Sequence, residues 1–230
     1  MYEVLFNDIS SFEYNIVPVR RPSIPAPERN ITETTIPGRD GELVTSDNSY
    51  KPITIDVEFN FMSKPNSWAQ TFRNAKKWLT GKGKLSFSDD PGYFYDVYYV
   101  RISDSERSST RIGSFTAQFV CNPYTYLTSG NTQINLPSQS ITNNYDVSHP
   151  LYYISGTGVC TITINGKEFE ANVSGSMYID SDLMISYKNN QNMSTFVTGD
   201  YEDLWLQSGV NTVAISSGFT AKITPRWRCL

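Results

Sequence analysis

The chain has 230 residues, enough to bury a sizeable core in one large domain or two modest ones. Hydrophobic residues make up 39% and aromatic residues 13%, which argues against disorder and favours strands. The formal charge of -4 comes from 19 basic and 23 acidic residues without a long basic cluster, so the composition argues against nucleic acid as the principal ligand.

Neither the N-terminal sequence nor any apolar segment suggests export or membrane insertion. The first eight residues carry acids where a secretory signal would carry lysine or arginine, and no segment approaches the roughly 20 apolar residues that cross a bilayer. The three cysteines, Cys121, Cys160 and Cys229, are odd in number and lack a CxxC spacing. We therefore expect reduced structural thiols in a protein made in the cytoplasm.

Residues 18–41 form the first unusual segment. Five prolines interrupt it, and Arg20 and Arg21 stand side by side. Proline lacks the N–H that a sheet ladder needs, so we expect an extended arm or edge segment that offers a contact surface to a neighbour. Near its end, two glycines bracket the pair Arg39 and Asp40 in Pro37–Gly41. The pair is either an exposed ion pair in a turn or part of an intersubunit contact.

Three segments of the first half predict strands. In Pro52–Phe61, apolar residues alternate with polar ones, which is typical of a half-buried antiparallel strand. The alternation returns in Phe115–Cys121, and Asp96–Ile102 is a further β-rich run. We expect these three strands to share one sheet.

A single helix is expected between them, over Ser67–Thr80. Trp68, Phe72, Ala75 and Leu79 repeat at helical spacing, which predicts that this face packs on the sheet. Ser67 is placed as the N-cap, Lys76 and Lys77 lie near the negative end of the helix dipole, and Gly81 can supply the left-handed stop.

The composition changes near residues 126–132, where the chain becomes rich in Ser, Thr, Asn and Gly. We therefore expect two domains, 1–128 and 129–230. The second contains strand-like runs joined by turn signals, of which Asn165-Gly166 is the strongest hairpin signal. Further turns are expected at Ser181-Asp182, 189–192, Ser208-Gly209 and Ser217-Gly218. This pattern is typical of a β-sandwich or jelly roll.

The sequence nominates no catalytic residues. His149 is the single histidine, which excludes a multi-histidine metal site and suggests a structural role. Two acidic groups, Asp180 with Asp182 and Asp200 with Glu202 and Asp203, lack the spacing of a calcium loop, so we expect solvated turn acids. A glycosidase or peptidase would need a carboxylate pair or a nucleophile that cannot be assembled here. We expect no enzyme activity, cofactor or metal.

Aromatic residues of the second half leave one alternative open. Tyr152, Tyr153, Tyr201 and Trp205 could stack on sugars if they were exposed, which would make this half a carbohydrate-binding module for host cell-wall polysaccharide. Strand aromatics more often fill the core of a sandwich.

Several separated segments together resemble one family, the distal tail proteins of siphophages. Any one of them is a weak signal, but their order and spacing agree over essentially the whole chain. They are Ile36–Leu43, Trp78-Leu79 of the helix, Lys84–Pro91, Phe119–Tyr124, Ile162–Gly166, Met177–Asp180, Leu206–Val213 and Ile223–Arg228. The departures are modest: Asn122 stands where Asp is more usual, and Ser208 occupies a turn position that is often proline.

This resemblance implies a mainly β fold and a structural role. It implies an N-terminal split β-barrel related to tail-tube proteins, carrying one helix, followed by a galectin-like β-sandwich. It also implies a homohexameric ring at the tail tip of the virion, with Arg39 and Asp40 as interface residues. The expected partners are the major tail tube protein, a tail-associated lysin or tip protein, and further the receptor-binding and tape-measure proteins.

Overall fold

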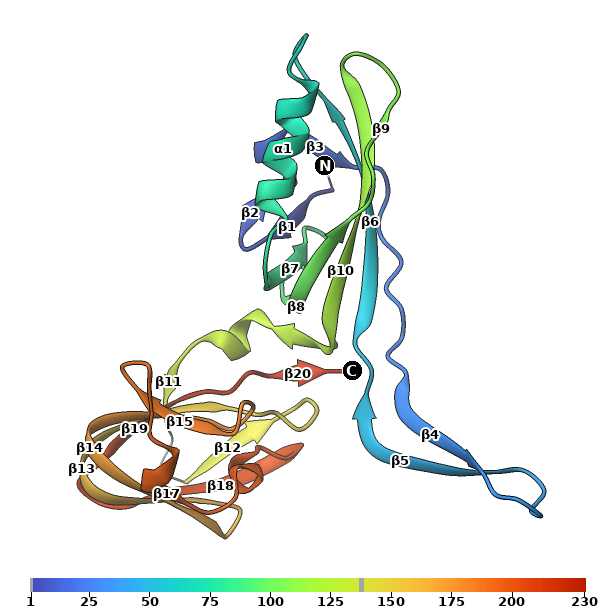
Figure 1. Cartoon of the computed structure of the whole chain (residues 1–230). Coiled ribbons are helices and arrows are strands. Elements are labelled where there is room, and N and C mark those ends of the chain that lie inside the picture. The colour runs from blue at the N-terminus through green and yellow to red at the C-terminus, as the bar shows by residue number, and fades with distance from the viewer. Residues whose placement is uncertain (1, 137–138) are drawn as a thin grey trace. The chain divides into compact units, whose positions relative to one another are not determined.

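The computed structural model describes residues 2–136 and 139–230; Met1, Pro137 and Ser138 lie outside the described residues. The chain divides into two compact units, Met1–Thr125 with Leu230, and Tyr126–Cys229. Each unit has a hydrophobic core of its own. The fold is mainly β, and α1 is the only α-helix among the described residues (Figure 1). The predicted fold class is confirmed.

In the first unit, the strands of one sheet follow the order β2-β1-β7-β8-β10-β6-β3, with β9 paired to β10. The sheet curls around α1 and a short 3-10 helix (Figure 1). The elements are β1 (Val4–Phe6), β2 (Ile9–Ser10), η1 (Ser11–Tyr14), β3 (Ile16–Pro18), β4 (Arg29–Thr35), β5 (Glu42–Tyr50), β6 (Ile53–Met62), α1 (Trp68–Trp78), β7 (Gly83–Phe87), β8 (Tyr93–Ile102), β9 (Glu106–Arg107) and β10 (Ile112–Leu127).

The three predicted strands of this unit are confirmed as parts of β6, β8 and β10, which are neighbours in the sheet. β6 and β10 pair in antiparallel register, so that Phe59 lies opposite Phe115 and Val57 opposite Ala117. These four side chains are buried, while the residues between them in β6 are exposed or half-buried. The alternation of the sequence therefore separates a core face of the sheet from an outer face.

The helix lies on the core face, and its ends differ in one detail from the prediction. Ser67 occupies the N-cap position, but its hydroxyl donates to the Lys64 carbonyl at 2.8 Å and does not accept from the helix. At the other end Gly81 has φ of 90°, which confirms the left-handed stop. Ala75 and Leu79 are buried as expected.

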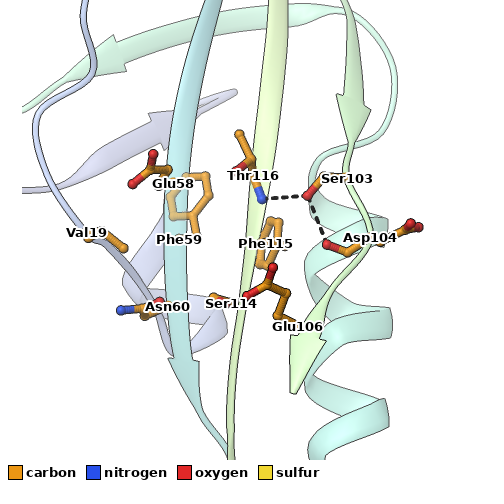
Figure 2. A pocket seen from close by; sticks show the side chains of 10 residues that line it. All are labelled: Val19, Glu58, Phe59, Asn60, Ser103, Asp104, Glu106, Ser114, Phe115 and Thr116. Carbon is orange, nitrogen blue, oxygen red and sulfur yellow. Dashed lines mark hydrogen bonds between the residues drawn. The ribbon is translucent and has the colours of Figure 1, made fainter. Parts of the chain in front are cut away.

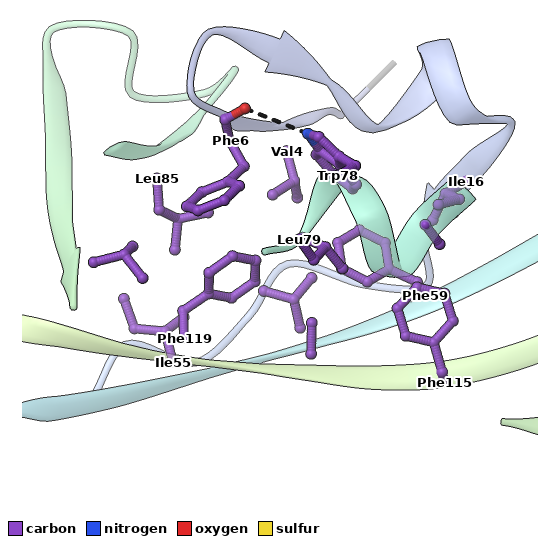
Figure 3. Packing of buried hydrophobic residues seen from close by; sticks show 14 of the residues in the cluster. Val4, Phe6, Ile16, Ile55, Phe59, Trp78, Leu79, Leu85, Phe115 and Phe119 are labelled. Carbon is purple, nitrogen blue, oxygen red and sulfur yellow. Dashed lines mark hydrogen bonds between the residues drawn. The ribbon is translucent and has the colours of Figure 1, made fainter. Parts of the chain in front are cut away.

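Trp78 occupies the centre of the first core, although the predicted stripe did not include it. Its indole ring stacks on Tyr14 with centroids 5.4 Å apart and meets Phe59 edge-on at 6.2 Å. Its Nε1–H donates to the Phe6 carbonyl at 3.3 Å (Figure 3). One side chain thus joins η1, β6 and β1.

The proline-rich segment has two parts. Residues 19–28 form no strand, as expected of an extended arm. The following residues form an antiparallel hairpin, β4–β5, which is a sheet of two strands by itself. The expected extended arm or edge segment is therefore confirmed, with an arm over residues 19–28 and an edge strand in β4, which pairs with a strand that follows the glycine turn.

In the second unit, the strands of the main sheet follow the order β11-β19-β13-β14-β15-β16. Outside this order, β18 pairs with both β12 and β13, and β17 pairs with β14. The elements are η2 (Thr128–Asn131), β11 (Ile134–Asn135), β12 (Ser140–Asn143), β13 (Leu151–Ile164), β14 (Lys167–Asp180), β15 (Ile185–Lys188), β16 (Gln191–Asn192), η3 (Ser194–Phe196), β17 (Val197–Thr198), η4 (Tyr201–Leu204), β18 (Gly209–Ile215), β19 (Thr220–Thr224) and β20 (Arg228–Cys229).

The long hairpin β13–β14 organises this unit. Its two strands pair from Ile164 with Lys167 to Leu151 with Asp180, and the loop between them is Asn165-Gly166. Both loop residues have positive φ, 53° and 82°, which is the backbone that a two-residue hairpin turn requires. The predicted hairpin is confirmed. Among the described helices, none is long and apolar enough to span a membrane.

Candidate assembly surface

The tip of the β4–β5 hairpin holds both predicted interface residues. Thr35 pairs with Glu42, so the loop consists of residues 36–41. Gly38 and Gly41 have φ of 81° and 79°, and the Arg39 N–H donates to the Ile36 carbonyl at 3.1 Å. The two glycines therefore allow a tight loop that presents Arg39 and Asp40 to solvent. No salt bridge joins these two side chains in the described part of the chain.

The hairpin is exposed along its whole length. Every residue from Arg29 to Ser49 is exposed, including the apolar side chains of Ile31 and Val44, which are 46% and 58% accessible. Two strands alone leave one unpaired edge on each side, and such a hairpin is at best marginally stable in water. A hairpin of this kind is a surface that a partner can cover.

The residues before the hairpin are fixed to the body of the first unit. Arg20 forms an ion pair with Glu58 at 2.8 Å, and Arg21 forms one with Asp89 at 2.7 Å. The Arg21 guanidinium also lies 5.0 Å from the centroid of the Tyr2 ring. Burial, assisted by the Asp89 charge and opposed by Arg21, raises the pKa of Tyr2 to about 12. Both arginines thus anchor the start of the arm.

A half-open groove of about 410 Å³ lies on the outer face of the first unit's main sheet, over β6 and β10 (Figure 2). The residues that line it are Val19, Glu58, Phe59, Asn60, Ser103, Asp104, Glu106, Ser114, Phe115 and Thr116. The Ser103 hydroxyl accepts from the Thr116 N–H and donates to the Asp104 carbonyl. The groove contains three carboxylate side chains, Glu58, Asp104 and Glu106, but neither histidine nor cysteine.

His149 belongs to a polar cluster in the second unit. Its ring stacks on Trp205 with centroids 4.0 Å apart, its Nδ1 lies 2.8 Å from Asp182 Oδ1, and Arg228 Nη2 lies 2.8 Å from its Nε2. A guanidinium can only donate, so Nε2 accepts from Arg228 and Nδ1 donates to Asp182. The nitrogen that a general base would use is therefore occupied by Arg228.

Asp180 is not a solvated turn acid, and the expectation for it was wrong. Its side chain is 4% accessible and forms a two-point ion pair with Arg226, at 2.7 and 2.9 Å. Oδ1 of Asp180 also accepts from the backbone N–H groups of Asp182 and Leu183. The Asp180 carboxylate thus holds both the β14–β15 turn and the C-terminal segment. Among the described residues, no group of three or more His, Cys, Asp or Glu residues could hold a metal.

This cluster makes the second unit sensitive to acid. The hydrogen bond from His149, opposed by burial and assisted by Arg226 and Arg228, lowers the pKa of Asp182. The stability that this carboxylate contributes is fully present above its unfolded pKa of about 3.9 and is lost as the pH falls through the lower folded value. We expect the urea midpoint of the second unit to decrease below about pH 4, and Asp182→Asn to flatten that decrease. An unchanged pH profile in the variant would contradict this role.

The aromatic residues considered for sugar binding are mostly used inside the second unit. Tyr152 is completely buried and its hydroxyl donates to the Leu204 carbonyl, so it does not meet the condition of exposure that sugar stacking requires. Trp205 has one face covered by His149, and Tyr201 packs on Phe169 at 5.2 Å. Tyr153 is half-buried and packs beside Tyr178.

The model of a family described as phage tail protein RIFT-related domain matches residues 3–121, which is more than half of the chain. The chain belongs to this family. Its members are structural proteins of the phage tail, so the chain is a virion component, as the resemblance implied.

The fold of the whole chain is also similar to a solved structure. The Dit protein of phage SPP1 matches with a TM-score of 0.67 and 15% identity, over 97% of this chain and 98% of the other. That protein is described as a paradigm of the hub adsorption apparatus in phages that infect Gram-positive bacteria. At this identity the match shows a shared fold, and it covers both units. A search of curated proteins finds no match.

Proposed function

We propose that this tail protein is the structural hub of the tail tip. Six copies close into a ring that joins the tail tube to the tail-associated lysin or tip protein and to the host-adhesion proteins. Residues 1–128 form the ring, and residues 129–230 form a galectin-like sandwich on its outer side. The receptor-binding and tape-measure proteins are further partners, and neither nucleic acid nor a membrane is required.

Family membership and the likeness to a hub protein over both units support this role. The observation that carries it is the β4–β5 hairpin, whose residues are exposed from Arg29 to Ser49. A subunit that contacts one neighbour with one surface and the other neighbour with a different surface forms heterologous contacts. Such contacts close into a ring when the rotation from one subunit to the next allows it. The hairpin, with Arg39 and Asp40 at its tip, is one of these two surfaces.

Shortening the hairpin is expected to abolish the ring. In the shortened chain, residues 31–48 are replaced by Asn-Gly, which closes a two-residue turn between Asn30 and Ser49. Light scattering should give about six times the 26.0 kDa mass of one chain for the full-length protein, and one chain mass for the shortened protein. Far-UV circular dichroism should show that the shortened chain remains folded, since the hairpin contributes to neither core.

A matched control keeps the hairpin and changes charge elsewhere. Glu168→Lys with Glu170→Lys alters two exposed residues of β14 and should leave the ring intact. Rings of normal mass from the shortened chain would remove the hairpin from the interface. A full-length chain that forms no ring, even when the tip protein is added, would overturn the proposed function.

A further inference from the structure

Positive charge in the first unit is concentrated around α1. Residues 63–88 contain six basic residues and no acidic one. Five of the six are exposed, namely Lys64, Arg73, Lys76, Lys77 and Lys82, and we call the three that share one side of α1, Arg73, Lys76 and Lys77, the basic face. No ion pair involves this face in the described part of the chain.

The basic face is a source of repulsion within a single copy. Arg73 and Lys77 are four residues apart on α1, and Arg73 and Lys76 are three apart, spacings at which like charges destabilise a helix. Some of this charge already contacts polar or aromatic groups: Arg73 donates to Gln70, and Lys76 lies 4.9 Å from the Phe72 ring centroid. An anionic partner would relieve the repulsion that remains.

The β4–β5 hairpin carries the opposite charge. Between Asn30 and Asn48 it has four acidic residues, Glu33, Asp40, Glu42 and Asp47, and a single basic residue, Arg39. Asp47 is held by Ser49, which lowers its pKa through the hydrogen bonds from that residue. The other three acids are exposed around the tip. The exposed hairpin is therefore acidic. It also needs a covering surface, because two strands with unpaired edges are at best marginally stable in water.

We propose that the basic face of α1 receives the acidic tip of the β4–β5 hairpin from a neighbouring copy. Asp40 and Glu42 approach Arg73 and Lys77, while apolar residues of the hairpin are shielded from water. This inference rests on the proposed ring and identifies its two contacting surfaces. The occupant is a second copy, because the complementary charge and the need for a cover are found in this chain itself.

Opposite charges on different surfaces also favour the required kind of contact. If two copies met with α1 against α1, basic side chains would oppose basic side chains, and like charges in contact are unfavourable. A head-to-tail contact instead joins basic to acidic at every interface, and it is the kind that closes into rings. The charge distribution is thus suited to a contact between α1 of one copy and the hairpin of another.

Charge reversal on either surface tests the proposal. Arg73→Glu with Lys77→Glu changes the basic face, and Asp40→Lys with Glu42→Lys changes the hairpin. Each variant alone should raise the protein concentration needed for the ring by about tenfold or more, because like charges then meet at every contact. The matched controls, Lys222→Glu and Glu168→Lys with Glu170→Lys, change exposed residues of the second unit and should have no effect.

An equal mixture of the two reversed variants should restore the ring. In the mixture, a reversed hairpin contacts a reversed helix and a native hairpin contacts a native helix, so opposite charges meet at every contact. The two variants then alternate around the ring. A ring of six can alternate without a mismatch because six is an even number. A chain that carries all four substitutions should also form the ring by itself. Rings of the single-surface variants should weaken further at low salt, where screening is least.

Two outcomes would overturn the inference and leave the proposed function standing. In one, the native chain forms the ring and the Arg73→Glu, Lys77→Glu variant forms it equally well. In the other, neither reversed variant forms the ring and their mixture does not form it either, which would show that each pair of substitutions disrupts assembly for a reason other than contact between the two surfaces. A native chain that forms no ring, even when the tip protein is added, overturns the proposed function itself.

Discussion

Replacement of Arg226 by Met is expected to lower the free energy of unfolding of the second unit by about 3–5 kcal/mol. Asp180 would remain as a buried charge, 4% accessible, without the guanidinium that now contacts both of its oxygens. Hydrogen exchange resolved by residue in β13 and β14 measures the loss, because these strands belong to the second unit. A loss similar to that of a surface substitution would contradict the burial of the pair.

The partner substitution separates charge from packing. Asp180→Asn in the Arg226→Met background removes the stranded charge, and its amide oxygen can still accept from the Asp182 and Leu183 N–H groups. The double variant should therefore be more stable than Arg226→Met alone. Lys167→Met is a matched control, because the Lys167–Asp203 pair is exposed on its lysine side and its loss should change stability little.

Trp78→Ala is expected to cost the first unit about 3–5 kcal/mol, the usual range for removal of a large aromatic side chain from a core. The indole is 6% accessible and contacts η1, β1 and β6 at once. Its loss leaves a cavity and removes the hydrogen bond to the Phe6 carbonyl (Figure 3). Hydrogen exchange resolved by residue should show faster exchange in β6 and β10.

Two comparisons test whether the effect of Trp78→Ala comes from lost packing in the first core. Trp78→Phe keeps much of the packing with Phe59 but loses the hydrogen bond to Phe6, so it should cost less than the alanine variant. Protection in β13 and β14 should be unchanged in both variants, because the second unit has a separate core. Equal loss of protection in both units would contradict the separation of the two cores.

Strong local patterns predicted the elements that build the cores. The alternation in Pro52–Phe61 predicted β6, because a strand with one buried face must repeat with a period of two. Asn165-Gly166 predicted the β13–β14 hairpin for a backbone reason, its positive φ values. Trp78 was missed because the buried face of α1 is wider than the stripe that runs through Ala75 and Leu79.

The β4–β5 hairpin had a weaker signal. Its strands are exposed on both faces, so their polar side chains show no apolar period, and the nearby prolines suggested an arm. The glycine turn around Arg39 and Asp40 was recognised, but a turn alone does not show that its two flanks pair. The signal that was overlooked is the group of threonines in β4, because threonine favours strands.

The polar cluster around His149 had no local signal at all. Its members come from four separate parts of the second unit, His149, Asp180 with Asp182, Trp205, and Arg226 with Arg228. Single acids in turns are usually solvated, so sequence reasoning assigned Asp180 and Asp182 to water. Only the folded chain brings them within hydrogen-bonding distance of one another.

The exposed hairpin also has a consequence for copies that have not yet been incorporated. A protruding loop with glycines and polar residues at its tip is the kind of site where proteases cut most readily. When a neighbour covers residues 36–41, the bond that is easiest to cleave becomes hidden. The hairpin would then determine how long a spare subunit survives in the infected cell, and incorporation into the virion would end that vulnerability.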